Sequence, residues 1–174
     1  DIGATANTGY RFVNWETTGG VTVEDANSAS TTVTATASGT ATAHFEAKQY
    51  TITLEPNGGS GITPSVTATY NSSTLSSAIA NPQKTGYTFA GWYSGSGGTG
   101  SLVINTGGVL QANVSDYTGE NGIWTKDDNA TLYAKWIEQK EIYLVGEFGW
   151  DNPTEEYKFT AHQTKPGVYT LTKH

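Results

Sequence analysis

The strongest constraint on this chain is an internal repeat. The octet TGYTFAGW at residues 85–92 repeats TGYRFVNW at residues 8–15, with both aromatics and the closing tryptophan in the same register. A second repeated motif follows each copy, since TATAHF at 40–45 parallels TLYAKW at 131–136. Self-similarity of this kind indicates that one small unit was duplicated and placed in series. Arrays of such units are typical of proteins that extend outward and present a binding domain, and not of enzymes.

Length and composition favour small β-rich units. A chain of 174 residues has room for one to three small domains, and the repeat favours the upper end. Units this small have cores close to the lower limit for independent folding, so aromatic side chains must supply much of the burial. Five Trp, ten Tyr and five Phe are present for this. A charged fraction of only 14%, with regular apolar alternation, is typical of β-sheets and not of disorder.

Charge and residue usage exclude several classes of function. With a net charge of −7 and only nine Lys and Arg, the chain has no basic cluster to neutralise phosphates, which argues against nucleic acid as a partner. No apolar run approaches the roughly 18 residues of a membrane-spanning helix. Cysteine is absent, which excludes disulfides and thiol chemistry. Methionine is absent even at the first position, so we expect a fragment of a longer protein.

Residues 1–48 are predicted to be the later part of one unit, with its opening strand missing. Period-two alternation predicts short strands in this segment. We expect a turn at residues 17–20, where Thr and Gly cluster. A second turn at 38–39 would then join strands at 31–37 and 40–45 into a hairpin.

Residues 49–138 are predicted to be a complete unit with one short helix. Alternation predicts strands, and the stretch Pro-Asn-Gly-Gly that follows the first one is a strong turn signal. Leu75, Ala78 and Ile79 lie at i, i+3 and i+4, which predicts about two helical turns before Pro82. The fold class is therefore mainly β with a short helix (α+β), in an order that resembles a β-grasp. The strands are expected at 50–54, 66–70, 87–93, 102–104, 109–114 and 131–136, with a flexible loop at 94–100.

Residues 139–174 break the repeat. A strand is expected at 142–150, running into an aromatic turn, and further strands at 157–159 and 168–171. This order predicts the beginning of a β-sandwich that the segment leaves incomplete.

Three linked motifs carry a resemblance to a known family. The alternating strand at 50–54 with its Asn-Gly-Gly turn, the octet at 85–92 and the closing run at 130–136 make residues 49–137 resemble the Listeria–Bacteroides repeat, the B-repeat of internalins and other bacterial surface proteins. Residues 1–47 resemble the divergent form of that repeat. The resemblance implies an extracellular β-grasp-like unit in tandem, with adhesion or ligand-binding roles and no catalysis. Residues 140–174 resemble the start of a starch-binding or glycoside-hydrolase-associated sandwich, a module of glycan-binding proteins of Bacteroidetes.

The aromatic residues divide into candidate core and candidate binding residues. Those in the repeated motifs are expected to fill the small cores, because such units need their area, although a row of ligand-stacking faces is the alternative. Loop aromatics are better candidates for ligand binding, although they can also fold back as plugs. The expected core residues are Tyr10, Phe12, Trp15, Phe45, Tyr87, Phe89, Trp92 and Trp136. The candidate ligand-binding residues are Tyr117 and Trp124 in the insertion and Phe148 and Trp150 in the last segment.

No catalytic or metal-binding pattern is predicted. The acidic stretches at 127–129 and 151–152 could supply oxygen ligands to calcium, but they lack the spacing of a calcium loop, and turn or cap roles explain them. Glu155 and Glu156 are adjacent, so on a strand they would face opposite ways and not act as a carboxylate pair. His44 occupies the position of Lys135 in the other copy, which argues against a base or a metal ligand. We predict no cofactor and no metal.

The sequence therefore predicts a non-catalytic part of a bacterial secreted or cell-surface protein. It would act as a stalk or adhesion module that spaces or presents a neighbouring domain of the parent chain. The alternative is glycan capture at the cell surface. The expected partners are a host surface protein or a glycan, with no nucleic acid.

Overall fold

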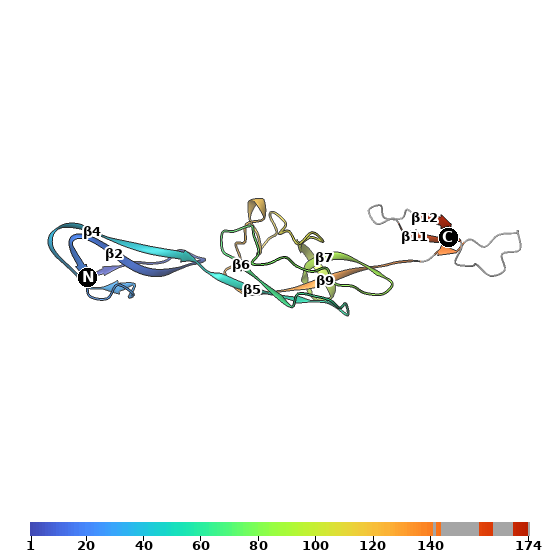
Figure 1. The fold of residues 1–174 in the computed structure, drawn as a ribbon, viewed down its shortest axis with the longest axis horizontal. Coiled ribbons are helices and arrows are strands. Elements are labelled where there is room, and N and C mark those ends of the chain that lie inside the picture. Colours follow the sequence, from blue (N-terminus) through green and yellow to red (C-terminus); the bar gives the residue numbers. More distant parts are fainter. Residues whose placement is uncertain (141, 144–156, 162–168, 174) are drawn as a thin grey trace, which may run out of the picture.

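The computed structural model describes residues 1–140, 142–143, 157–161 and 169–173, and it is mainly β. Figure 1 shows a long two-stranded ribbon followed by a five-stranded sheet along the long axis of the molecule. The N-terminus lies on the ribbon, and β9 runs out at the opposite end of the sheet.

The ribbon is one long antiparallel hairpin. Its strands β2 (Tyr10–Val23) and β4 (Val33–Ala47) pair along their length, and β1 (Ile2–Gly3) pairs with β3 (Ser30–Thr31) beside them. The turns predicted at 17–20 and 38–39 are wrong, because both segments lie inside these strands. Gly19 and Gly39 lie opposite one another, and a Cβ on Gly39 would collide with the backbone oxygen of Thr18. Glycine is needed here for close approach of two backbones and not for a turn.

The five-stranded sheet contains most of the strands predicted for residues 49–138. Its spatial order is β6-β5-β9-β7-β8, and all neighbours are antiparallel except the central pair β5 and β9, which is parallel. The strands are β5 (Gln49–Glu55), β6 (Ser65–Thr69), β7 (Tyr87–Gly95), β8 (Thr99–Ile104) and β9 (Ala130–Glu138).

Three local predictions for this sheet are wrong. The segment with Leu75 and Ile79 is not helical, because it runs beside β6 and bonds to it, with Ser76 N–H donating to the Thr67 oxygen at 2.9 Å. The loop expected at 94–100 is replaced by the single turn η1 (Ser96–Gly98) between β7 and β8. Residues 109–114 make only an isolated bridge, between Leu110 and Ile104.

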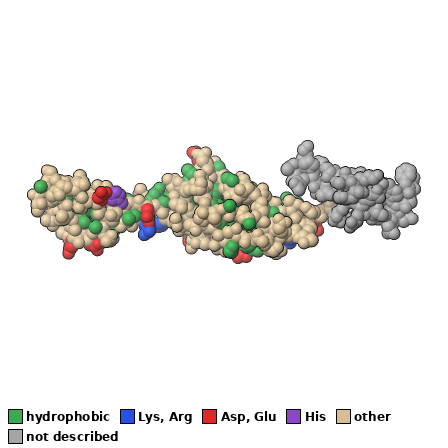
Figure 2. Space-filling model, in the orientation of Figure 1, with side chains coloured by type: hydrophobic (Ala, Val, Ile, Leu, Met, Phe, Trp, Pro, Cys, Tyr) green, Lys and Arg blue, Asp and Glu red, His purple; other side chains and the backbone are tan. Residues whose placement is uncertain are grey.

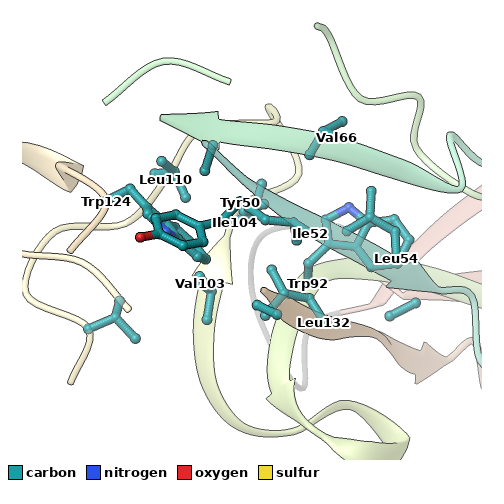
Figure 3. Close-up of a cluster of buried hydrophobic side chains, with 14 residues drawn as sticks. Tyr50, Ile52, Leu54, Val66, Trp92, Val103, Ile104, Leu110, Trp124 and Leu132 are labelled. Carbon is teal, nitrogen blue, oxygen red and sulfur yellow. The ribbon is translucent and has the colours of Figure 1, made fainter. Parts of the chain in front are cut away.

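One core lies against the sheet (Figure 3). Alternation along β5 turns Tyr50, Ile52 and Leu54 to the same buried face, as a strand period of two requires. The insertion between β8 and β9, which includes the short turn η2 (Glu120–Gly122), adds Leu110, Val114 and Trp124 to this core. Each large side chain buried here contributes roughly 1.5–3 kcal/mol relative to exposure. The insertion is therefore part of the folding unit and not an appended loop.

The last segment contributes a separate three-stranded sheet. Its strands β10 (Ile142–Tyr143), β11 (Tyr157–Ala161) and β12 (Tyr169–Lys173) are antiparallel neighbours in that order. They form one sheet, so the predicted sandwich stays a prediction.

Candidate functional site

The two octets build the same aromatic cluster in both parts of the chain. In each cluster a central phenylalanine contacts the closing tryptophan of its octet and an aromatic on the partner strand. Ring centroids lie 5.7 and 5.9 Å apart in the cluster of Phe12, Trp15 and Phe45. They lie 5.2 and 5.6 Å apart in the cluster of Phe89, Trp92 and Trp136. The register also matches, with a bulge after Phe12 and another after Phe89.

The expected core aromatics are buried to different degrees. Trp92 is fully buried and Trp15 nearly so, while Tyr10, Phe12, Phe89 and Trp136 are half-buried. Phe45 is 40% exposed and Tyr87 is 37% exposed, so neither is a core residue. Phe45 differs from Trp136 because a two-stranded ribbon has no second layer to cover it.

The position shared by His44 and Lys135 ties the two strands of each pair together. His44 Nε2 lies 2.9 Å from the Glu16 carboxylate on β2. The Lys135 ammonium lies 4.5 Å from the ring centroid of Tyr93 on β7, a cation–π contact. Two different side chains, His44 and Lys135, therefore serve the same structural purpose on matching strands.

The two insertion aromatics do not form an open binding face. Trp124 has no exposed surface, and its backbone bonds to Ser72 and Asn71 at 2.9 Å, so the prediction that its ring binds a ligand is wrong. Tyr117 packs edge-on against Trp124, with centroids 6.1 Å apart, and the Lys126 ammonium lies 5.4 Å from its ring centroid. Burial raises the pKa of Tyr117 above its usual 10.0. The two side chains act together as the plug that was the alternative prediction.

The other candidate residues belong to the last segment of the chain. Phe148, Trp150, the stretch 151–152 and the pair 155–156 lie outside the described residues. Within the described residues, no group of three or more His, Cys, Asp and Glu side chains has the proximity to hold a metal ion. No helix in that part of the chain is long and apolar enough to cross a membrane.

Several polar contacts between distant parts of the chain lie at the junction between ribbon and sheet. Lys48 is the single residue between β4 and β5. Its N–H donates to the Gly9 oxygen at 2.8 Å, and its own oxygen accepts from the Tyr70 N–H at 2.9 Å. Both backbone groups of the linking residue are therefore held, one by the ribbon side and one by the sheet.

Side chains reinforce this junction around Asp127. The Tyr50 hydroxyl donates to the Asp127 carboxylate, and the Lys48 ammonium lies 3.3 Å from it. Burial raises the pKa of Tyr50 to about 12, and the neighbouring carboxylate adds to the rise. The hydrogen bond from Tyr50 in turn lowers the pKa of Asp127, with Lys48 and the Gly9 backbone adding to the effect. Asp127 thus anchors the junction through its contacts with Tyr50 and Lys48.

A shallow pocket of about 490 Å³ opens beside the junction. Its charged groups are paired, because Arg11 forms an ion pair with Glu46 and Lys48 binds Asp127. The face in Figure 2 shows only scattered charges, with one blue-and-red pair near the place where the ribbon meets the sheet. Since these charges already satisfy one another, the pocket has little with which to attract an ionic ligand. Its lining residues are Arg11, Glu46, Ala47, Lys48, Gln49 and Tyr50.

Comparison with known proteins identifies the repeats. Residues 50–117 match the Listeria-Bacteroides repeat domain, and residues 1–49 match the divergent InlB B-repeat domain. Proteins with such repeats are typically bacterial surface or secreted proteins, and no catalytic family is indicated. No curated protein and no solved structure matches the chain. The two segments that carry the paired octets therefore match two related repeat families in direct succession.

Proposed function

We propose that this chain is a non-catalytic spacer of a bacterial secreted or cell-surface protein, which holds a neighbouring domain of the parent chain at a set distance. The observation that carries the proposal is the end-to-end order of ribbon and sheet, joined by the single residue Lys48. The chain enters on the ribbon and β9 runs out at the opposite end (Figure 1), which is the geometry of a stalk segment. The matches to two repeat families that are typical of cell-surface proteins support the same role.

We propose further that residues 1–48 and 49–138 are two units in tandem, and that the second is related to the β-grasp. The order β6-β5-β9-β7 with a parallel central pair is the strand order of that fold. The irregular segment between β6 and β7 takes the place of its helix. The paired aromatic clusters support a common origin for the two units.

The reach of the folded spacer follows from its strands. At about 3.3 Å per residue, the 14 residues of β2 and the nine of β9 span roughly 75 Å end to end. A flexible Gly/Ser linker of about 140 residues, the number in the two units together, has a root-mean-square length of roughly 65 Å, with wide fluctuation. The folded spacer therefore differs from a flexible linker mainly in the narrow range of distances that it allows.

Contact with a host protein or a glycan remains a lesser proposal. Of the four aromatic residues predicted to bind ligand, Trp124 is buried, and Tyr117 is half-buried with the Lys126 ammonium 5.4 Å from its ring centroid. These positions favour the spacer over glycan capture for residues 1–140.

A cell-surface display experiment tests the spacer role. The chain is placed between an outer-surface anchor and a small reporter domain, and binding of an antibody to the reporter is measured on intact cells. We expect strong binding with the full chain and weaker binding when the reporter follows the anchor directly. Equal binding in both cases contradicts the proposal. Saturable binding of a polysaccharide by the isolated chain, measured by affinity electrophoresis, would favour glycan capture instead.

A further inference from the structure

The Gly-Tyr corner that opens each octet has the same backbone geometry in both repeats. Gly9 has φ +79° and Gly86 has φ +77°. Each glycine oxygen accepts a 2.8 Å hydrogen bond from the residue after the second strand of its pair, Lys48 in the ribbon and Gln139 in the sheet. The two corners are thus matched copies of one local structure.

Among the described residues, an aromatic ring covers the Gly9 corner but not the Gly86 corner. The ring of Tyr70, at the end of β6, lies directly on Gly9, where an added Cβ would collide with three of its ring carbons. At Gly86 an added Cβ would meet no atom of the described residues within 4 Å. The difference comes from the element that follows, because Tyr70 belongs to the second repeat and reaches back onto the first.

Further contacts extend the Tyr70 packing across the junction. The rings of Tyr10 and Tyr70 meet edge to face, with centroids 5.7 Å apart. The Asn71 side-chain amide donates to the Tyr10 hydroxyl at 3.3 Å. Edge-to-face packing is one of the two arrangements that aromatic pairs prefer, and the hydrogen bond adds a second contact between the same two segments. Lys48 lies between these contacts with both of its backbone groups bonded, so the chain connection itself is not a swivel.

We infer that the Tyr70 face of the second repeat docks on the Gly9–Tyr10 corner of the first as a rigid joint, so that the two repeats move as one body. This inference rests on the spacer function proposed above and specifies how the spacer keeps its direction. Gly9 is required because any side chain at this position would displace the Tyr70 ring. The partner that such a corner accepts is an aromatic ring laid flat on the glycine, with an amide beside it.

Matched glycine substitutions in the full chain test the joint. Gly9→Ala and Gly86→Ala introduce the same left-handed strain, but only Gly9→Ala pushes on Tyr70. Residual dipolar couplings are measured for the amides of β2 and β4 and, separately, for those of β5 to β9. We expect one alignment tensor to fit both sets in the natural protein and in Gly86→Ala. In Gly9→Ala the ribbon tensor should fall about twofold in magnitude relative to that of the sheet, because the ribbon then moves independently.

A second variant distinguishes loss of the joint from local unfolding of the Gly9 corner. Tyr70→Ala leaves the Gly9 backbone unstrained and should separate the two tensors in the same way, while amide shifts of β2 and β4 away from the junction stay unchanged. Two different tensors in the natural protein would overturn the joint, as would equal behaviour of the two glycine variants. The spacer and the joint can fail separately. If the full chain does not improve reporter binding but one tensor fits the natural protein, only the spacer role is contradicted. If the full chain improves binding but the natural protein needs two tensors, only the joint is contradicted.

Discussion

The buried Tyr50 hydroxyl should make the protein sensitive to alkali. Its side chain is only 8% exposed and donates to the Asp127 carboxylate. Burial and this carboxylate raise the pKa of Tyr50 from 10.0 to about 12. The unfolded chain releases this proton near pH 10, whereas the folded protein holds it until about pH 12. The stability due to the raised pKa is therefore fully present below pH 10 and is lost as the pH rises through 12.

The size of this loss follows from the shift. One pKa unit corresponds to about 1.4 kcal/mol, so the free energy of unfolding should fall by roughly 3 kcal/mol between these limits. Tyr50→Phe removes the titration. At neutral pH this variant should be about 1 kcal/mol less stable, because it loses one hydrogen bond. By pH 12 the order should have reversed, and the variant should be the more stable protein by about 2 kcal/mol.

Urea unfolding at a series of pH values measures this crossing. Tryptophan fluorescence reports on the relevant core, because Trp92 and Trp124 are buried in the same cluster as Tyr50 (Figure 3). Other groups, including Tyr117, titrate in both proteins, and the comparison with Tyr50→Phe subtracts them. If the two proteins lose stability in parallel from pH 8 to 12, Tyr50 is not the group responsible and the argument fails.

Three further predictions concern the core, the repeat and the junction. Trp124→Ala should lower the free energy of unfolding by about 3–5 kcal/mol in urea titrations, and a loss below about 1 kcal/mol would place the ring outside the core. Trp136→Phe, which introduces the residue of the first repeat, should cost about 1 kcal/mol in the same assay, because the 2.9 Å bond from its indole N–H to the Pro56 oxygen is lost. Asp127→Asn should reduce the loss of stability on acidification, because the lowered pKa of Asp127 contributes stability above 3.8 that disappears as the pH falls through the folded value. Thermal melts at pH 2 to 7 check this, and an unchanged acid profile contradicts it.

Much of the sheet could be predicted because its strands have one buried face. Along β5, Tyr50, Ile52 and Leu54 alternate with polar residues, and this pattern is local to the strand. The repeated octets predicted one duplicated unit, and the structure gives both copies the same strand pairing with a bulge after the central phenylalanine. Family membership was predicted from the same residues and is confirmed by the family comparison.

The errors arise where one pattern fits two structures. The spacing of Leu75 and Ile79 suits a helix, but two turns are too short to be stable alone, and the segment instead bonds to the edge of β6. Gly39 suits a turn as well as a close approach of strands. Only the partner strand decides between them, and a single segment holds no information about it.

The candidate site was the least predictable part. Trp124 lies in a polar, glycine-rich stretch, and its burial depends on contacts with Ser72 and Asn71, far away in the chain. The contact of Tyr70 with Gly9 joins residues of different repeats and follows no local period. Comparison of the two octets could have indicated that the glycine serves a packing role, but not which ring covers it.

The parallel pairing of β5 and β9 has a mechanical consequence. β5 begins at the junction with the ribbon, and β9 ends at the opposite end of the sheet, so tension along the molecule pulls these two neighbours in opposite directions along their lengths. The force then acts in shear on all the interstrand hydrogen bonds of this pair at once. The pairing runs from Ile52 opposite Ala130 to Glu55 opposite Tyr133. A strand pair pulled apart from one end would instead lose its bonds one at a time. The sheet is therefore oriented to resist stretching along the axis on which a tethered surface protein is pulled.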